Sequence, residues 1–460
     1  MYKGIKLKKD KIIYLQIYNF LKLKIENCEL NGKLMPIRKL ANLINVSPST
    51  ISKAYTELES NGFVMKKEGS GVYVNNKKYK NIFLEDHMES ETFTYGDFNP
   101  DFSIDLSSAT PNETILPMKI LKKSINVVLD RDKENAFLYE DPKGYYFLRK
   151  TIMEKLKKDD DIYTNIDNLY LVSGAQQGIN LFSKSFLSSK DIVVVESPTY
   201  KGAIDTFKKI GCKIISVPIF EDGYSLTELK KILKKNKIKL FYTMTNFQNP
   251  TGFSMSHKKK LELLKLSNSF NFNILEDDSL SDLYFTEKKP FTLKKLDKNN
   301  KVIYIKSYSK IFMPGLKLAC ISLPKDIYIL KKFTYKVIHS GLNQRAFQYL
   351  LENNYWDIHM EKARNSFKSK QILMYNNLKK IEDINFYKPE GGLSFWIKLP
   401  NNISSKAIYL KLLSKKIGIL PGILFSSNFD NYIRVSFAQC KTKDIKFAIK
   451  ELNSVIISLK

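Results

Sequence analysis

Lys310 is the residue of this sequence that is best placed for covalent chemistry. The apolar run 302–305 predicts a short buried strand, and Pro314-Gly315 predicts a turn, so Lys310 follows the end of the strand. Sheets of the α/β class place their ligand sites at that end of their strands. A lysine amine that is removed from water loses part of its preference for the charged form and becomes a nucleophile toward aldehydes.

Four other predicted strands are also followed by groups that suit a cofactor. They are the segment 173–178 after strand 169–172, Tyr200 after 192–195, Asn249 after 240–243 and Asp277 after 274–275. Taken singly, each feature has a common structural explanation. The start of a helix is most often capped without binding a ligand, and a single tyrosine most often packs in the core or at its edge. Together a phosphate-binding helix start, an aromatic face, an amide, an acid and a lysine are what a pyridoxal 5'-phosphate (PLP) site requires.

The elements that must position these groups begin near residue 104. From there short apolar strands alternate with amphipathic helices such as 178–187 and 258–268. This alternation predicts an α/β fold with a mostly parallel sheet and helices on both faces. Near the C-terminus, residues 432–437 predict a strand that carries Arg434, whose guanidinium has the geometry to bind a carboxylate.

The first eighty residues have a different pattern and a denser positive charge, with 16 Lys and Arg against 6 Asp and Glu. Helical spacing predicts helices over 14–25, 36–44 and 50–60, with Ser47 as the N-cap of the third. Residues 63–65 and 71–74 predict a β-hairpin. Three helices followed by a β wing indicate a winged helix-turn-helix, although a small helical interaction domain with a basic surface has the same pattern.

Two groups of side chains in this segment suit double-stranded DNA. Small polar or basic groups on the third helix could enter a major groove, and basic groups elsewhere could contact phosphates. The candidates for the groove are Ser49, Thr50, Ser52 and Lys53, and those for phosphates are Arg38, Lys39, Lys66 and Lys67.

The N-terminal segment resembles the winged-helix domain of GntR-type bacterial regulators. The resemblance is carried by residues 36–41 (PIRKLA), 46–51 (VSPSTI), 54–55 (AY), 62–63 (GF) and 69–74 (GSGVYV). Residues 104–455 resemble the class I aminotransferases of PLP fold type I, which implies a smaller C-terminal subdomain. The two together are similar to the MocR subgroup of GntR regulators.

The aminotransferase resemblance implies a role for each site residue. Lys310 would bind PLP covalently, Asp277 would pair with the pyridine nitrogen, Asn249 would bond the ring hydroxyl and Tyr200 would stack on the ring. The phosphate would be held by Ala175, Gln176 and Ser307, with Lys317 where the family usually has an arginine. Arg434 would bind an α-carboxylate, and Tyr139 would reach the phosphate of a second subunit in a homodimer. A tyrosine that the family has shortly after the aspartate is replaced here by Ser279, so we expect one bond to the ring hydroxyl to be missing.

These patterns divide the chain into a winged helix-turn-helix (1–76), a linker (77–103) and an aminotransferase-like, PLP-binding domain (104–460). No apolar stretch reaches the ~20 residues that a membrane span needs. The four cysteines are scattered and form no spaced cluster with the histidines, so we expect free thiols, a cytoplasmic location and no metal site.

The function that we expect is a PLP-dependent, DNA-binding transcriptional regulator that senses PLP, an amino acid or an amine. One alternative is a PLP-dependent aminotransferase that transfers an amino group between an amino acid and a 2-oxo acid. A second alternative is a scaffold that binds no PLP. The altered Ser279 and Lys317 positions favour the regulator over a full transamination cycle.

Overall fold

The computed structural model describes residues 12–26, 30, 32–67, 70–74, 102–325, 327 and 340–460. The chain separates into a small N-terminal unit and a large unit that begins at Tyr95 and holds nearly all of the rest. The predicted linker, apart from Phe102 and Ser103, lies outside the described residues.

The N-terminal unit is a winged helix-turn-helix. Its elements are α1 (Ile13–Glu26), α2 (Ile37–Leu43), α3 (Pro48–Ser60) and the antiparallel strands β1 (Val64–Lys67) and β2 (Gly71–Val74). Its helices enclose a core to which Ile17, Leu40 and Ile51 contribute. The Ser47 hydroxyl accepts a hydrogen bond from the backbone N–H of Thr50 (3.2 Å), so the predicted cap of the third helix is present.

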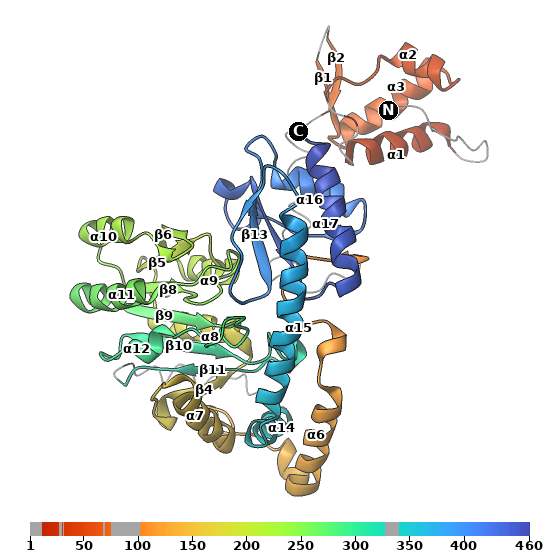
Figure 1. The fold of residues 1–460 in the computed structure, drawn as a ribbon. Coiled ribbons are helices and arrows are strands. Elements are labelled where there is room, and N and C mark those ends of the chain that lie inside the picture. Colours follow the sequence, from red (N-terminus) through yellow and green to blue (C-terminus); the bar gives the residue numbers. More distant parts are fainter. Residues whose placement is uncertain are drawn as a thin grey trace. The chain divides into compact units, whose positions relative to one another are not determined.

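The large unit is built on an eight-stranded sheet with the order β4-β11-β10-β9-β8-β5-β6-β7 (Figure 1). The strands are β4 (Leu169–Val172), β5 (Ile192–Ser197), β6 (Lys213–Phe220), β7 (Gly223–Tyr224), β8 (Leu240–Thr243), β9 (Asn273–Asp278), β10 (Val302–Ser307) and β11 (Ala319–Ser322). Neighbours from β10 through β6 are parallel, whereas β11 is antiparallel to both β10 and β4, and β7 is antiparallel to β6. The predicted, mostly parallel sheet is confirmed.

Successive side chains of the strands point to opposite faces of the sheet and contribute to two separate hydrophobic cores. The helices are α8 (Gly174–Phe186), α9 (Lys201–Ile210), α10 (Leu226–Lys235), α11 (His257–Phe270) and α12 (Leu293–Leu296). Val193 and Val195 of β5 pack with α8 and α9, while Val194 between them packs with α10 and α11. Helices therefore cover both faces, and the ends of the parallel strands remain available for a site.

A smaller subdomain completes the large unit. Its antiparallel sheet has the order β12-β13-β16-β15, and the bounds are β12 (Asn385–Phe386), β13 (Ser394–Lys398), β15 (Leu420–Pro421) and β16 (Tyr432–Ser436). It is accompanied by α15 (Tyr355–Leu378), α16 (Ser405–Leu413) and α17 (Thr442–Ile457). The long helix α15 packs on α17 at one end and on α14 (Gly341–Glu352) at the other, and so connects the subdomain to the rest of the unit (Figure 1).

The remaining elements are short or peripheral. They are α6 (Met118–Asp132), α7 (Tyr146–Asp160), the parallel pair β3 (Ile104–Asp105) and β14 (Ile417–Gly418), and the 3-10 helices η1 (Glu113–Ile115), η2 (Lys133–Phe137), η3 (Ile166–Asn168), η4 (Pro314–Leu316), η5 (Gly422–Leu424) and η6 (Ser427–Phe429).

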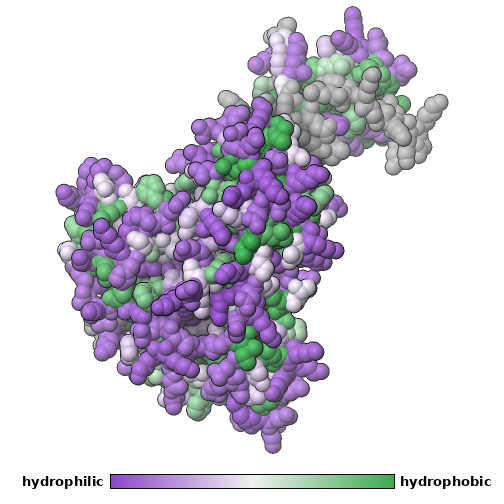
Figure 2. All heavy atoms as spheres, in the orientation of Figure 1, coloured by the Kyte–Doolittle hydropathy of each residue, from purple (hydrophilic) through white to green (hydrophobic). Residues whose placement is uncertain are grey.

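The surface of the large unit is mostly hydrophilic on the face seen in Figure 2, and the described cysteines form no disulfide bonds. In the view of Figure 2 hydrophilic side chains cover most of the large unit and leave only small hydrophobic patches. Within the described part of the chain no helix is both long and apolar enough to cross a bilayer. Cys212, Cys320 and Cys440 are free thiols, and Cys28 lies outside the described residues.

Candidate functional site

One cavity of about 260 Å³ opens at the carboxyl ends of the parallel strands, and most of the predicted groups meet there. Eight of the ten residues that were predicted to bind cofactor or effector line it: Ala175, Gln176, Tyr200, Asn249, Asp277, Ser307, Lys310 and Lys317. They come from the start of α8, the approach to α9, and the loops or last residues of β8, β9 and β10. Tyr139 and Arg434 do not line this cavity.

Asp277 is a buried carboxylate at the end of β9. It accepts hydrogen bonds from the hydroxyls of Ser279 (2.6 Å) and Tyr242 (2.9 Å). Burial raises the pKa of Asp277, although these two bonds and the charge of Lys310 act in the opposite direction. The described residues give Asp277 no ion pair, so a cationic nitrogen placed in the cavity would compensate its charge.

Ser279 has a partner that its sequence position did not reveal. Its hydroxyl donates to Asp277 and stabilises the ionised carboxylate. Leu280, the next residue, also lines the cavity. This part of the wall therefore supports Asp277 and is otherwise apolar.

The loop that carries Lys310 is held together by hydrogen bonds between the Ser309 hydroxyl and the backbone of Leu318. The Ser309 hydroxyl accepts from the backbone N–H of Leu318 (3.0 Å) and lies 3.2 Å from the carbonyl oxygen of the same residue. Lys317 has a φ of +50°, in the left-handed region that few side-chain-bearing residues adopt. Ser307, Ser309 and Lys317 all line the cavity.

Gln176 and Gly202 form a contact that the sequence analysis missed. The Gln176 side-chain amide donates to the carbonyl oxygen of Gly202 (3.2 Å) and to the hydroxyl of Thr206 (3.1 Å). A Cβ at position 202 would lie 2.3 Å from Gln176 Oε1 and 2.7 Å from Cζ of Tyr200. A larger side chain at position 202 would therefore displace Gln176 and Tyr200, which both line the cavity.

Arg434 lies beside the cavity with its guanidinium already engaged. It is buried on β16 and donates to Asn249 Oδ1 (2.7 Å) and to the carbonyl oxygen of Ser107 (2.5 Å). Its Nε has no hydrogen-bond partner among the described residues. Burial lowers the pKa of Arg434 to about 10, so the group stays charged at neutral pH.

Tyr139 lines neither the Lys310 cavity nor any other described pocket. Its side chain is 96% exposed, and the adjacent Phe137 and Leu138 are 67% and 63% exposed. Three consecutive large apolar residues at a surface are typical of a contact with another molecule.

Two buried glutamates support the strand ends around the cavity. Glu196 accepts from the hydroxyl of Thr243 (2.6 Å) and from the amide of Gln248 (3.4 Å), which is the neighbour of Asn249. Glu276 accepts from the hydroxyl of Thr245 (2.5 Å). Burial raises the pKa of each glutamate to about 7.

These raised pKa values predict how stability depends on pH. Because the folded state holds each proton up to about pH 7 and the unfolded chain releases it near its ordinary pKa of ~4.3, the free energy of unfolding should fall as pH rises between these values and level off above them. The loss is at most about 4 kcal/mol per carboxyl. Urea unfolding at pH 5, 6, 7 and 8 measures it. Glu196→Gln should flatten the slope, whereas Glu382→Gln, at an exposed site, should not. A slope that Glu196→Gln leaves unchanged would contradict this assignment.

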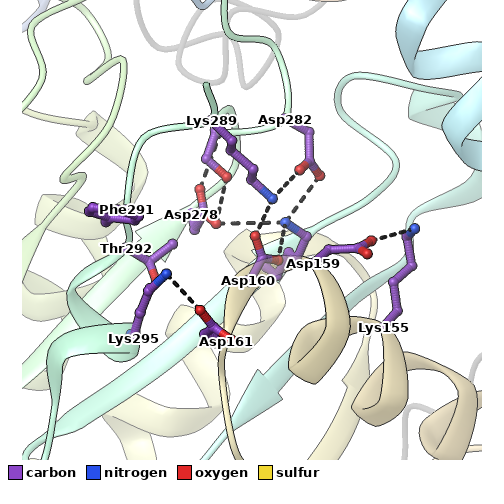
Figure 3. A network of polar contacts seen from close by, with 12 residues as sticks. Lys155, Asp159, Asp160, Asp161, Asp278, Asp282, Lys289, Phe291, Thr292 and Lys295 are labelled. Atoms are coloured by element: carbon purple, nitrogen blue, oxygen red, sulfur yellow. Dashed lines mark hydrogen bonds and ion pairs between the residues drawn. The ribbon is translucent and has the colours of Figure 1, made fainter. Parts of the chain in front are cut away.

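A buried network of charges connects β9 and β10 with the end of α7, and Figure 3 shows Asp160, Asp278, Asp282 and Lys289 of this network. The ammonium of Lys306 lies 3.0 Å from Asp282, 3.5 Å from Asp160 and 3.8 Å from Asp278. Lys289 also contacts Asp282 (2.5 Å) and Asp160. Burial alone would raise the pKa of Asp282, but the charges of Lys289 and Lys306 outweigh it and hold this pKa far below its ordinary value. Since Asp278 follows Asp277 and Lys306 precedes Ser307, the network fixes two strand ends of the cavity.

The predicted DNA-binding residues lie on α2, α3 and β1 of the N-terminal unit. Arg38 and Lys39 on α2 and Ser49, Ser52 and Lys53 on α3 are exposed. Thr50 is half-buried, and its hydroxyl lies 2.7 Å from that of Ser47.

The two wing lysines are both engaged. Lys66 forms an ion pair with Glu59 (2.8 Å), and Lys67 lies 5.1 Å above the ring of Tyr73. Lys53 lies in the same way 4.9 Å above the ring of Tyr14, so among the described residues Arg38 and Lys39 are the predicted basic groups with neither a carboxylate nor a ring beside them.

Two family descriptions match separate parts of this chain. Residues 104–452 match "Aminotransferase class I and II", and residues 13–74 match "Bacterial regulatory proteins, gntR family". These matches coincide with the large unit and with the winged helix-turn-helix.

Two curated relatives align over nearly the whole length of this chain. The chain is 30% identical to an uncharacterized HTH-type transcriptional regulator YdfD of Bacillus subtilis, over 97% of this chain and 96% of the relative. It is also 30% identical to the HTH-type transcriptional regulator NorG of Staphylococcus aureus, over 92% of this chain and 99% of the relative.

Solved structures of aminotransferases are similar to the large unit. The kynurenine aminotransferase of Pyrococcus horikoshii aligns with a TM-score of 0.74 at 27% identity and covers 82% of this chain and 94% of its own. The multiple substrate aminotransferase of Thermococcus profundus aligns with a TM-score of 0.73 at 27% identity and covers 78% of this chain and 92% of its own.

Proposed function

Because the chain belongs to the gntR family of bacterial regulatory proteins and carries a class I and II aminotransferase domain, we propose that it is a transcriptional regulator whose DNA binding responds to PLP. In this proposal residues 1–76 bind DNA, 77–103 are a linker and 104–460 bind the cofactor. The observation that carries it is that eight residues predicted for one cofactor line one cavity, in a chain that also has a DNA-binding unit.

The residues around the cavity fit PLP. Lys310 would hold the aldehyde carbon through its amine, and Asp277, which lacks an ion pair among the described residues, would compensate a protonated pyridine nitrogen. Asn249 and Tyr200 would contact the ring. The phosphate would lie between the α8 start at Ala175 and Gln176 and the side formed by Ser307 and Lys317. When bound, PLP supplies an electron sink for amino compounds.

The effector that we propose is an amino acid or amine that reaches the same cavity, or PLP itself. Arg434 lies at its edge, and the unpartnered Nε–H of its guanidinium is a donor for a carboxylate. In a cytoplasmic homodimer, the exposed Tyr139 of each subunit would reach the phosphate in the other.

Ligand binding changes DNA affinity only if it favours one arrangement of the protein over another.

Gel-shift experiments with the region upstream of the gene for this protein test the proposal. We expect a sequence-specific complex whose affinity changes when PLP is added. A complex that unrelated DNA of the same length competes away equally well, with and without PLP, would contradict the proposal.

Two basic side chains on α2 should contribute to this affinity without selecting sequence. Because Arg38 and Lys39 are exposed and would contact phosphates, Arg38→Ala with Lys39→Ala should weaken specific and non-specific binding alike and reduce the slope of log Kd against log salt by about 1 to 2. Fluorescence anisotropy at several salt concentrations measures it. Lys443→Met, at an exposed position on α17, is the control. Loss of only the specific complex would instead assign these residues to base recognition.

The similarity to aminotransferases supports one alternative, an enzyme that completes transamination cycles. It predicts many turnovers between an amino acid and a 2-oxo acid. The regulator predicts that each PLP-loaded protein reacts at most once. A change in DNA affinity requires only the ligand-bound state, and not the second half of the cycle, in which a 2-oxo acid would return the cofactor to its starting form. Counting product molecules per protein separates the two.

A further inference from the structure

A second cleft lies in the large unit beside the Lys310 cavity. Its volume is about 870 Å³, which is within the usual range of small-molecule sites. One wall is formed by the ends of β5 and β6 with the turn that follows, and the other by the small antiparallel sheet. The two cavities share no lining residue, although Thr251 lines the cleft and the next residue, Gly252, lines the Lys310 cavity. The cleft is therefore a separate site next to the first.

The wall on the small sheet is a platform of aromatic rings. Trp396 and Tyr432 stack at 5.2 Å with an angle of 14°, and Phe429 meets the Tyr432 ring edge-on at 5.6 Å. Because Lys398 pairs with Tyr432 across the sheet and lies two residues after Trp396, these three side chains share one face. Rings that already pack on each other lose little freedom when a flat ligand stacks on them.

The opposite wall adds apolar surface that is poorly covered. Phe220, at the end of β6, is 57% exposed, and Phe253 contributes a half-buried ring. A flat apolar ligand in the cleft would remove part of this surface from water.

The cleft also has one uncompensated charge of each sign. Asp222 is paired with Lys259 at 2.7 Å. Glu221 in the same turn and Lys398 on β13 are both exposed, and the described residues give neither of them an ion pair. An acid therefore lies on one wall and a base on the other.

We propose that this cleft binds a zwitterionic aromatic compound of the aromatic amino acid class. Its ring would stack on Tyr432, the half-buried ring that the buried Trp396 supports from behind, its ammonium would lie at Glu221 and its carboxylate at Lys398. A purely apolar ligand would leave both charges unused, and a ligand with a single charge would use only one. A polyanion is disfavoured by the neighbouring acids Glu221 and Asp222.

Such a ligand would give the protein an input that is separate from the Lys310 cavity. Since it would contact both the main sheet and the small sheet, its binding would favour the arrangement in which these walls are close together. This inference goes beyond the proposed response to PLP and does not require it.

Titration of the full-length Lys310→Ala protein with L-phenylalanine, without PLP or DNA, tests the site. Calorimetry should show saturable binding, and the tryptophan emission should change because one of the two tryptophans, Trp396, forms the wall. Glu221→Gln and Lys398→Met should each weaken binding about two- to fivefold. The matched surface changes Glu382→Gln and Lys443→Met should leave it unaltered. Phenethylamine and 3-phenylpropanoate, which each lack one charge, should both bind more weakly than L-phenylalanine.

Two results would overturn this site. One is the absence of saturable heat and emission change up to the solubility limit of L-phenylalanine. The other is binding that Glu221→Gln and Lys398→Met leave as tight as in the controls, which would place the amino acid elsewhere, for example at Arg434. Because neither PLP nor DNA is present, failure of this test is distinct from failure of the proposed regulatory function.

Discussion

Replacing Lys310 with alanine is expected to abolish covalent attachment of PLP to this protein. Of the two lysines that line the cavity together with Asp277, Asn249 and Tyr200, Lys310 is the one whose charge acts on the Asp277 carboxylate. A surface lysine reacts with aldehydes weakly and reversibly because its amine is protonated and solvated, whereas an amine in this cavity is held beside a positioned ring.

The measurement is reduction with sodium borohydride followed by peptide mass spectrometry. Wild-type protein incubated with PLP should carry one stable adduct, on the peptide that contains Lys310, and Lys310→Ala should carry none at any defined position. Lys317→Ala, which alters the same wall, should keep the adduct and bind PLP more weakly. An adduct on Lys317 or on scattered surface lysines of the wild type would contradict the assignment.

Replacing Lys306 with methionine should destabilise the large unit by about 3–5 kcal/mol, which is the usual cost of removing one partner from a buried ion pair. Lys306 is buried, and its ammonium is surrounded by Asp160, Asp278 and Asp282, the three carboxylates labelled in Figure 3. Methionine fills a similar volume, but Lys289 would then be the remaining ion-pair partner of Asp160 and Asp282, and Asp278 would lose the ion pair that it forms with Lys306. The carboxylates would then repel each other or take up protons.

Urea unfolding of the PLP-free protein at pH 7 measures this loss. Lys289→Met is the matched control, because Lys306 still compensates the same carboxylates and Lys289 is partly exposed, so its effect should be clearly smaller. The Lys306→Met protein should also regain stability as pH falls toward the range where the carboxylates protonate. A loss below about 1 kcal/mol for Lys306→Met would show that the network contributes little to the fold.

The parts of this molecule that follow local rules could be predicted from the sequence. Ser47 and Pro48 mark the start of α3 because capping is a short-range interaction, and the apolar run 302–305 marks β10 because a strand buried on both faces needs no polar positions. The cavity could be predicted in the same way, since parallel strands bring their carboxyl ends to one edge.

Other features depend on contacts between distant segments and left no local pattern. The antiparallel return of β11 is not evident from residues 319–322 alone. The burial and ion pairing of Lys306 could not be predicted from its neighbours in the sequence. Its partners include Asp160, at the end of a helix, and Asp282, in a loop, and both are distant from it in the sequence. The engagement of Arg434 with Asn249 likewise joins the two sheets of the large unit and appears only when both are folded.

The most direct test of the central claim is the affinity of the protein for its upstream DNA with and without PLP, measured by fluorescence anisotropy on wild-type and Lys310→Ala protein side by side. If the cavity controls the DNA-binding unit, PLP should change the wild-type Kd by about fivefold or more and leave that of Lys310→Ala nearly constant. A PLP effect of equal size in both proteins, or no effect in either, would contradict the account.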